Sequence, residues 1–183
     1  MKTYLIKLAI RGISPMITRR LKVSESISLA NLHHAIQIVY QWDNDYLHQF
    51  HIHGKDFGIS YIGGIIFADN PHKVCLNDFG LDIGDKFTYE YNFFDHWVVD
   101  IRVEKIEESD NADDKPRCIK GIGMLGADKY DEYECKINLL KAIVNANDET
   151  TVEEIRPLID KLNSVRFNRN LINDRLKSYT EDI

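Results

Sequence analysis

Residues 87–103, with the sequence FTYEYNFFDHWVVDIRV, decide the fold of this chain. Large apolar side chains alternate with polar ones in both halves of the stretch, and a corner at Phe94-Asp95 separates the halves. Alternation with a period of two is typical of a strand that buries one face. Two such runs joined by a short corner predict a β-hairpin, the clearest in the sequence.

More strands are expected before this hairpin. Residues 3–11 and 17–23 alternate in the same way, and the Gly-Ile-Ser-Pro sequence between them favours a turn. Residues 46–53 alternate again, with Phe50 and Ile52 on one face. Between residues 58 and 84, glycine and proline interrupt every run, so we expect only strand pieces and loops there.

Helical patterns complete the fold. Ser28 is suited to cap a helix that ends near Trp42, because apolar residues then recur every three or four positions. Three later segments also have helical signals: residues 131–145, a capping box from Thr151, and residues 168–179. The sequence therefore predicts an α+β fold with a predominantly antiparallel sheet in 1–106, a loop in 107–130 and a helical part in 131–183. At 183 residues the chain fits one domain, 1–183.

Composition limits the function classes. The formal net charge of −6 disfavours nucleic acid as a partner, because phosphate binding depends on Lys and Arg, although a local basic patch is still compatible with it. No apolar run approaches the roughly 20 residues of a membrane span, so we expect no membrane contact and a cytoplasmic location. Three widely spaced cysteines fit neither a disulfide framework nor a zinc knuckle.

Several motifs are similar to those of a known family. They are ITRRL at 17–21, LANLHHAIQ at 29–37, LHQF at 47–50 and GDKFTYEYNFFDHW at 84–97, in this order. With these motifs the chain resembles the plasmid pRiA4b ORF-3-like family, whose members are also labelled TnpR-like passenger proteins of the insertion element IS1096. The resemblance covers nearly the whole chain. It implies an α+β fold and an association with mobile elements, but little chemistry.

The chain departs from the family pattern at polar positions. Thr18 replaces Trp, Tyr46 replaces His, Gln49 replaces Glu, Asn92 replaces Asp, and Phe94 replaces the turn Gly. If these positions form a site in the family, this chain has lost much of it. The resolvase label finds no support in the residues, because no serine lies beside the arginine cluster that serine recombination needs.

A metal site is one hypothesis for the histidines. His51 and His53 share a face of the strand expected at 46–53, and a carboxylate such as Asp56 or Asp95 would complete a divalent-metal site. The alternative is that this face is simply polar and exposed to solvent.

Asp95 and His96 at the hairpin corner offer a base and its orienting carboxylate. Adjacent strand residues point apart, however, so we favour a structural interpretation in which Asp95 fixes the turn and Trp97 lies in the core. His48 points to the face opposite His51 by parity.

Two arginines follow one another in the second strand. Arg19 falls on the apolar face, where we expect it to pair with an acidic side chain, because an unpaired buried charge is costly. Arg20 and Lys22 share the other face and form a small basic strip suited to RNA or DNA. The candidate binding residues are Arg20, Lys22, Trp42, His48, Asp95 and Trp97.

The leading functional hypothesis is a non-enzymatic interaction or regulatory module of mobile elements that binds a protein partner. The second is a metal-dependent or hydrolytic enzyme that uses His48 to His53 and Asp95. The third is a DNA-associated accessory protein. The sequence identifies no cofactor and no oligomeric state.

Overall fold

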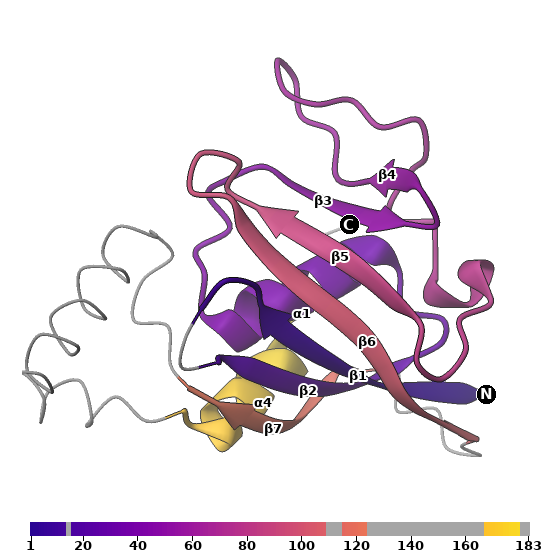
Figure 1. The fold of residues 1–183 in the computed structure, drawn as a ribbon, viewed down its shortest axis with the longest axis vertical. Coiled ribbons are helices and arrows are strands. Elements are labelled where there is room, and N and C mark those ends of the chain that lie inside the picture. The colour runs from indigo at the N-terminus through magenta and orange to yellow at the C-terminus, as the bar shows by residue number, and fades with distance from the viewer. Residues whose placement is uncertain (14–15, 109–114, 124–166, 180–183) are drawn as a thin grey trace, which may run out of the picture.

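The computed structural model describes residues 1–13, 16–108, 115–123 and 167–179. Its elements form one antiparallel sheet with two helices (Figure 1), which confirms the predicted α+β class. The strands follow the order β4-β3-β5-β6-β1-β2-β7. The elements in chain order are β1 (Lys2–Ile10), β2 (Thr18–Ser24), α1 (Leu29–Tyr40), β3 (His48–Ile52), β4 (Lys55–Phe57), the 3-10 turn η1 (Leu76–Phe79), β5 (Lys86–Tyr91), β6 (Trp97–Glu108), β7 (Arg117–Ile122) and α4 (Arg169–Ser178).

The hairpin predicted at 87–103 is confirmed as β5 and β6. Tyr89 lies opposite Val99 and Tyr91 opposite Trp97, so the apolar side chains of both strands face the same side. Asn92 begins the connecting turn with a φ of 52°, in the left-handed region that asparagine tolerates better than most residues. The N-terminal hairpin of β1 and β2 is confirmed as well.

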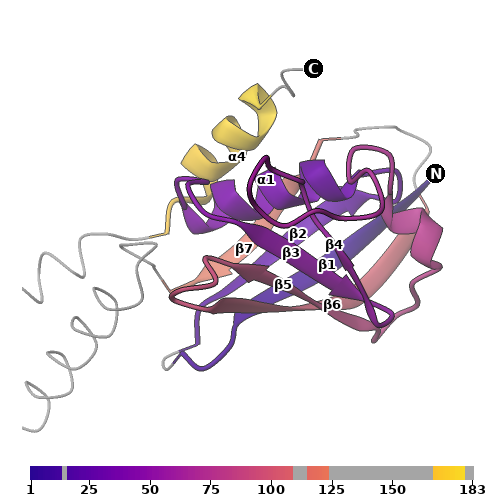
Figure 2. The same ribbon diagram turned by 90° about the horizontal axis from the view of Figure 1, so that it is seen from above.

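Helix α1 covers one face of the sheet. The Ser28 hydroxyl accepts a hydrogen bond from the Asn31 amide at 3.1 Å, which confirms the predicted cap. Gln41 ends the helix in the left-handed conformation. Figure 2 shows α1 and α4 on the same side of the sheet. No helix among the described residues lies on the opposite face.

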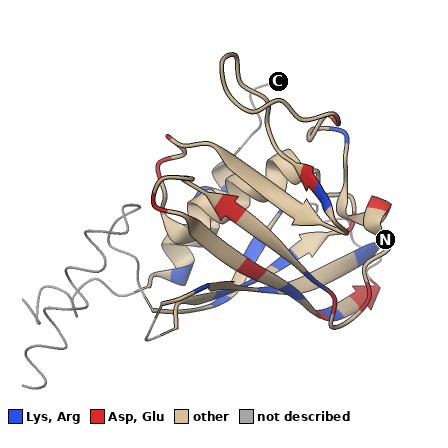
Figure 3. Ribbon diagram, turned by 45° about the horizontal axis from the view of Figure 1, so that its top comes forward, with Lys and Arg blue, Asp and Glu red and all other residues tan. Residues whose placement is uncertain are grey.

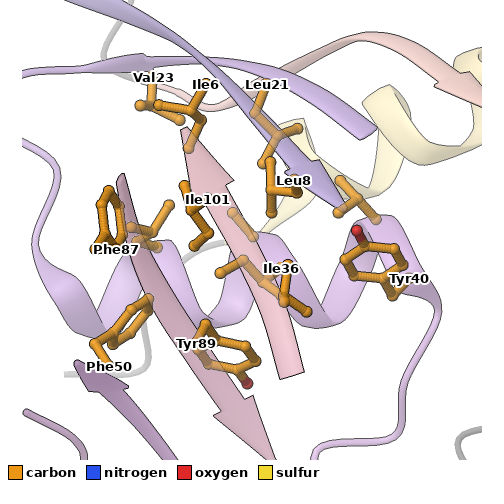
Figure 4. Close-up of a cluster of buried hydrophobic side chains, with 14 of the residues drawn as sticks. Ile6, Leu8, Leu21, Val23, Ile36, Tyr40, Phe50, Phe87, Tyr89 and Ile101 are labelled. Carbon is orange, nitrogen blue, oxygen red and sulfur yellow. The ribbon is translucent and has the colours of Figure 1, made fainter. Parts of the chain in front are cut away.

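The core fills the space between the sheet and α1. Figure 4 shows Ile36 and Tyr40 of α1 among strand side chains such as Leu8, Tyr89 and Ile101. All five residues are at most 1% exposed. Such close packing holds the inner-face side chains in place. We call the opposite face of the sheet, over which no described helix lies, the outer face.

The prediction of a loop over residues 107–130 is wrong in two places, because strands occupy its first residues and residues 117–122. β6 continues to Glu108, and residues 117–122 form β7, which pairs with β2. A bulge shifts the register between Arg20 and Leu21, and it removes the simple alternation from which a strand is predicted. The helix predicted at 168–179 is confirmed as α4, whereas those predicted at 131–145 and from Thr151 lie outside the described residues.

Candidate functional site

The structure places three predicted binding residues in the core. Trp42, His48 and Trp97 are 6%, 2% and 1% exposed, respectively. Trp42 stacks on Tyr91 with ring centroids 4.9 Å apart, and Trp97 lies 5.9 Å from Trp42. These indoles stabilise the fold and offer no surface to a ligand, as the structural interpretation of Trp97 predicts.

His48 belongs to a buried polar network that the sequence did not reveal. Its ring stacks on His33 with centroids 3.5 Å apart. His33 Nδ1 lies 2.8 Å from the Tyr89 hydroxyl, and His33 Nε2 lies 2.7 Å from Asn44 Oδ1. The Gln37 amide also donates to the Tyr89 hydroxyl, at 2.8 Å.

Both histidines of this network are held in the neutral form. Burial lowers the pKa of His33 well below its ordinary value, and the nearby His48 and His34 rings lower it further. Burial, with a further contribution from His34, lowers the pKa of His48 to about 3. The network therefore resists protonation, which gives folding a pH dependence.

His51 and His53 do not share one strand. His51 lies on the outer face of β3, and its Nδ1 is 2.7 Å from Asp56 Oδ1, so the predicted Asp56 neighbour is present. His53 lies beyond the strand end, in the turn to β4, with a φ of 50°. In the described part of the chain, no three His, Cys, Asp or Glu side chains are grouped to hold a metal ion. The metal site stays a prediction.

Asp95 acts within its own turn. Its carboxylate accepts a hydrogen bond from the Asn92 side-chain amide at 2.8 Å. The Asn92 Oδ1 atom in turn accepts from the Phe94 and Asp95 amides at 3.3 and 3.4 Å. These bonds support the structural interpretation of Asp95, and none of them joins Asp95 to His48.

The prediction that Arg19 pairs with an acidic side chain is wrong for the described residues. The guanidinium is fully buried and donates to the carbonyls of Val39, Thr18 and Ile122 at 2.8 to 2.9 Å. Its Cζ lies 4.3 Å from the Phe167 ring centroid. Carbonyl dipoles and an aromatic face therefore replace a carboxylate among the described residues. Burial lowers the pKa of Arg19.

Arg20 and Lys22 do share the outer face of β2. Arg20 Nε lies 2.6 Å from Glu104 Oε2, and Lys22 Nζ lies 2.8 Å from Glu107 Oε2. Both pairs are partly exposed, so each adds little stability. The basic strip therefore exists, with an acidic neighbour at each of its two residues.

The surface loop that follows β4 is strongly apolar. Residues 61–66, YIGGII, follow β4 and are here named the apolar loop; Figure 1 shows this segment extending away from the sheet. Ile62 and Ile66 are 109% and 84% exposed. The Gly64 amide donates to the Tyr61 carbonyl at 3.0 Å, and Gly63 has a φ of 79°. This is the geometry of a type II turn with Ile62 at its tip.

The base of the apolar loop is packed. The Phe67 amide donates to the Ser60 hydroxyl at 3.0 Å. The Phe67 ring lies so close to Gly58 that a Cβ there would come within 2.6 Å of it. The turn is therefore presented on an ordered base. The signal in the sequence is the apolar run itself, but two glycines interrupt it, so that it predicts only strand pieces and loop.

The fold and these surfaces describe an α+β protein with a packed core, a charged open sheet and one apolar loop. The sequence profile of the plasmid pRiA4b ORF-3-like proteins matches residues 2–174, and the chain belongs to this family. In the part of the chain that the structure describes, no helix is long and apolar enough to cross a membrane.

Two similar proteins give no activity to transfer. The uncharacterized protein y4hQ of Sinorhizobium fredii is 30% identical over 104 residues, which are 55% of this chain and 52% of that protein. The chain thus matches about half the length of that relative. The second is MM3350, a protein of unknown function from Methanosarcina mazei with a crystal structure. It is 28% identical in sequence to this chain and superposes with a TM-score of 0.69, and the match covers 92% of this chain and 96% of MM3350.

Proposed function

We propose that the protein is a non-enzymatic interaction module that binds a protein partner through the apolar loop. The observation that supports this most strongly is the exposure of Ile62 and Ile66 at 109% and 84%. Burying a large aliphatic side chain yields about 1.5–3 kcal/mol, so the exposed isoleucines offer a partner substantial binding energy. Contiguous exposed apolar residues on a soluble domain mark interaction sites.

The structure of the loop favours binding further. The turn at Tyr61 to Gly64 and the packed Phe67 define the backbone on which Ile62 is presented. A loop whose backbone is already held by a turn loses less conformational entropy on binding than one without such a turn. The apolar tip is therefore suited to fill a hydrophobic pocket of another protein.

The enzyme alternative uses His48 to His53 and Asp95. Of this set, His51 contacts the Asp56 carboxylate, and that contact would suit a base and its orienting carboxylate. Both side chains are about half exposed on the open sheet. Catalytic pairs act in concave, water-poor sites, so this setting favours binding over chemistry. The plasmid origin in the family's description supports a role with mobile elements. A cytoplasmic location is part of the proposal.

Photo-crosslinking tests the proposal. Benzoylphenylalanine replaces Ile62 in the full chain, which is expressed in the cells of its origin and irradiated. We expect one discrete adduct with another polypeptide, identified by mass spectrometry. Ile66→Ser in the same chain should abolish the adduct, because it removes half of the apolar tip.

The control places the same photo-reactive group at Ile83, an isoleucine that is 63% exposed elsewhere on the surface. The same adducts from positions 62 and 83 would refute the proposal, as would no adduct from position 62. An adduct at twice 21.3 kDa that contains only this chain would replace the heterologous partner with a second copy.

A further inference from the structure

Five basic residues lie in direct register across five neighbouring strands. Lys86 of β5 is opposite Arg102 of β6, Arg102 is opposite Lys7 of β1, Lys7 is opposite Arg20 of β2, and Arg20 is opposite Lys120 of β7. We name these residues the basic row. Directly paired residues project from the same face, and here it is the face opposite α1. Figure 3 shows Lys and Arg segments, in blue, on neighbouring strands.

Folding does not explain this arrangement. Like charges directly opposite one another on a sheet are destabilising. Glu104 compensates the middle of the row. The hydrogen bonds that its carboxylate accepts from Arg20 lower the pKa of Glu104, with further contributions from Lys7 and Arg102. Lys86 and Lys120, at the two ends, have no ion-pair partner among the described residues. The row therefore carries a local cost that a bound anion would relieve.

The surroundings keep this face positive. On the outer side of these five strands, eight basic side chains oppose the four acidic ones Glu90, Asp100, Glu104 and Glu107, an excess of four. The basic ones are Lys7, Arg20, Lys22, Lys86, Arg102, Lys105, Arg117 and Lys120. Charges farther away than the Debye length of about 8 Å are screened at physiological salt. The net charge of −6 therefore does not prevent an anion from binding here.

We propose that the basic row binds the phosphate backbone of a double-stranded nucleic acid without reading its bases. Strands lie about 4.8 Å apart, so the row spans about 19 Å. At 3.4 Å of axial rise per phosphate, this length covers about six phosphates of one strand, enough for each of the five basic residues to contact one. The outer side chains of the five strands include no aromatic residue on which unpaired bases would stack, so the surface favours a duplex over a single strand.

Fluorescence anisotropy with a labelled DNA duplex of about 20 bp, titrated with the full chain from 20 to 200 mM salt, tests this inference. Five phosphate contacts predict a slope of log K against log salt of about −4.5. The Lys86→Gln/Lys120→Gln variant should lower the magnitude of the slope to about 2.7, because two contacts are lost. Neither lysine is in an ion pair with a described residue, so this variant should keep its melting temperature.

The matched control is Lys73→Gln/Lys177→Gln, which changes the net charge equally at exposed sites off the sheet. It should keep the parent slope, and so should Ile62→Ser/Ile66→Ser, which tests the apolar loop separately. An unchanged slope in the Lys86/Lys120 variant would overturn the inference. Tighter binding to a single strand, or equal binding to poly-glutamate, would overturn it in favour of another ligand.

Discussion

The buried histidine pair predicts a specific loss of stability in acid. The folded protein holds His48 neutral with a pKa of about 3, whereas an unfolded histidine has a pKa of about 6.5. Below pH 6.5, His48 takes up a proton in the unfolded chain, whereas in the folded chain it stays neutral. The contribution of His48 is therefore fully present above pH 6.5 and is lost as the pH falls toward 3.

The size of this loss follows from the two pKa values. A pH of 5 is about 1.5 units below the pKa of His48 in the unfolded chain, and each unit corresponds to about 1.36 kcal/mol. His48 alone therefore lowers the unfolding free energy at pH 5 by about 2 kcal/mol. The pKa of His33 is shifted in the same direction by burial, and it adds to the loss. The unfolding free energy of a domain is typically about 5–15 kcal/mol, so a loss of this size is measurable.

Urea unfolding at pH 7.5 and pH 5.0 measures it, with the fluorescence of the buried Trp42 and Trp97 as the probe. In His48→Gln the residue no longer titrates, so the difference in unfolding free energy between the two pH values should shrink by about 2 kcal/mol. His72→Gln, the same change at an exposed position, is the control. An equal pH dependence in His48→Gln and the parent would refute the reasoning.

Three further predictions concern the fold. Gly121→Ala should destabilise by about 1–3 kcal/mol in urea unfolding, because its Cβ would lie 2.4 Å from the Phe167 ring, whereas Gly64→Ala, with its nearest atom at 3.5 Å, should change stability much less. Ser28→Ala should cost about 1 kcal/mol by the same assay, since α1 loses its N-cap, and a cost near zero would contradict that role. Arg19→Ala should cost more than about 3 kcal/mol in thermal or urea unfolding, because it leaves a cavity and three carbonyls without their donor; a loss below 1 kcal/mol would disprove a stabilising role for these bonds.

The sequence predicted the elements whose pattern is local. The hairpin at 87–103 alternates without interruption, and α1 begins with a residue type suited to cap it. β7 was missed because a bulge breaks its alternation and because its partner β2 is about 100 residues away. No local pattern in the sequence shows that the free edge of β2 pairs with a strand so distant in the chain.

The surfaces were harder to predict than the elements. Alternation placed Arg20 and Lys22 correctly on one face, but the basic row depends on the order and register of five strands, which alternation does not give. The stacking of His33 on His48 likewise depends on how α1 crosses β3. Arg19 shows a further limit of prediction from sequence. The burial of its charge predicts a carboxylate partner, whereas in the fold it donates to backbone carbonyls.

The most direct test of the central claim is the affinity of the partner crosslinked at position 62, purified and titrated calorimetrically. Ile62→Ser/Ile66→Ser should weaken binding by about 3 kcal/mol, or roughly 150-fold, because two buried isoleucines are lost. Ile83→Ser/Leu171→Ser, which removes two apolar side chains that are 63% and 44% exposed elsewhere, should bind like the parent. Equal affinity of the parent and the Ile62/Ile66 variant would contradict the account.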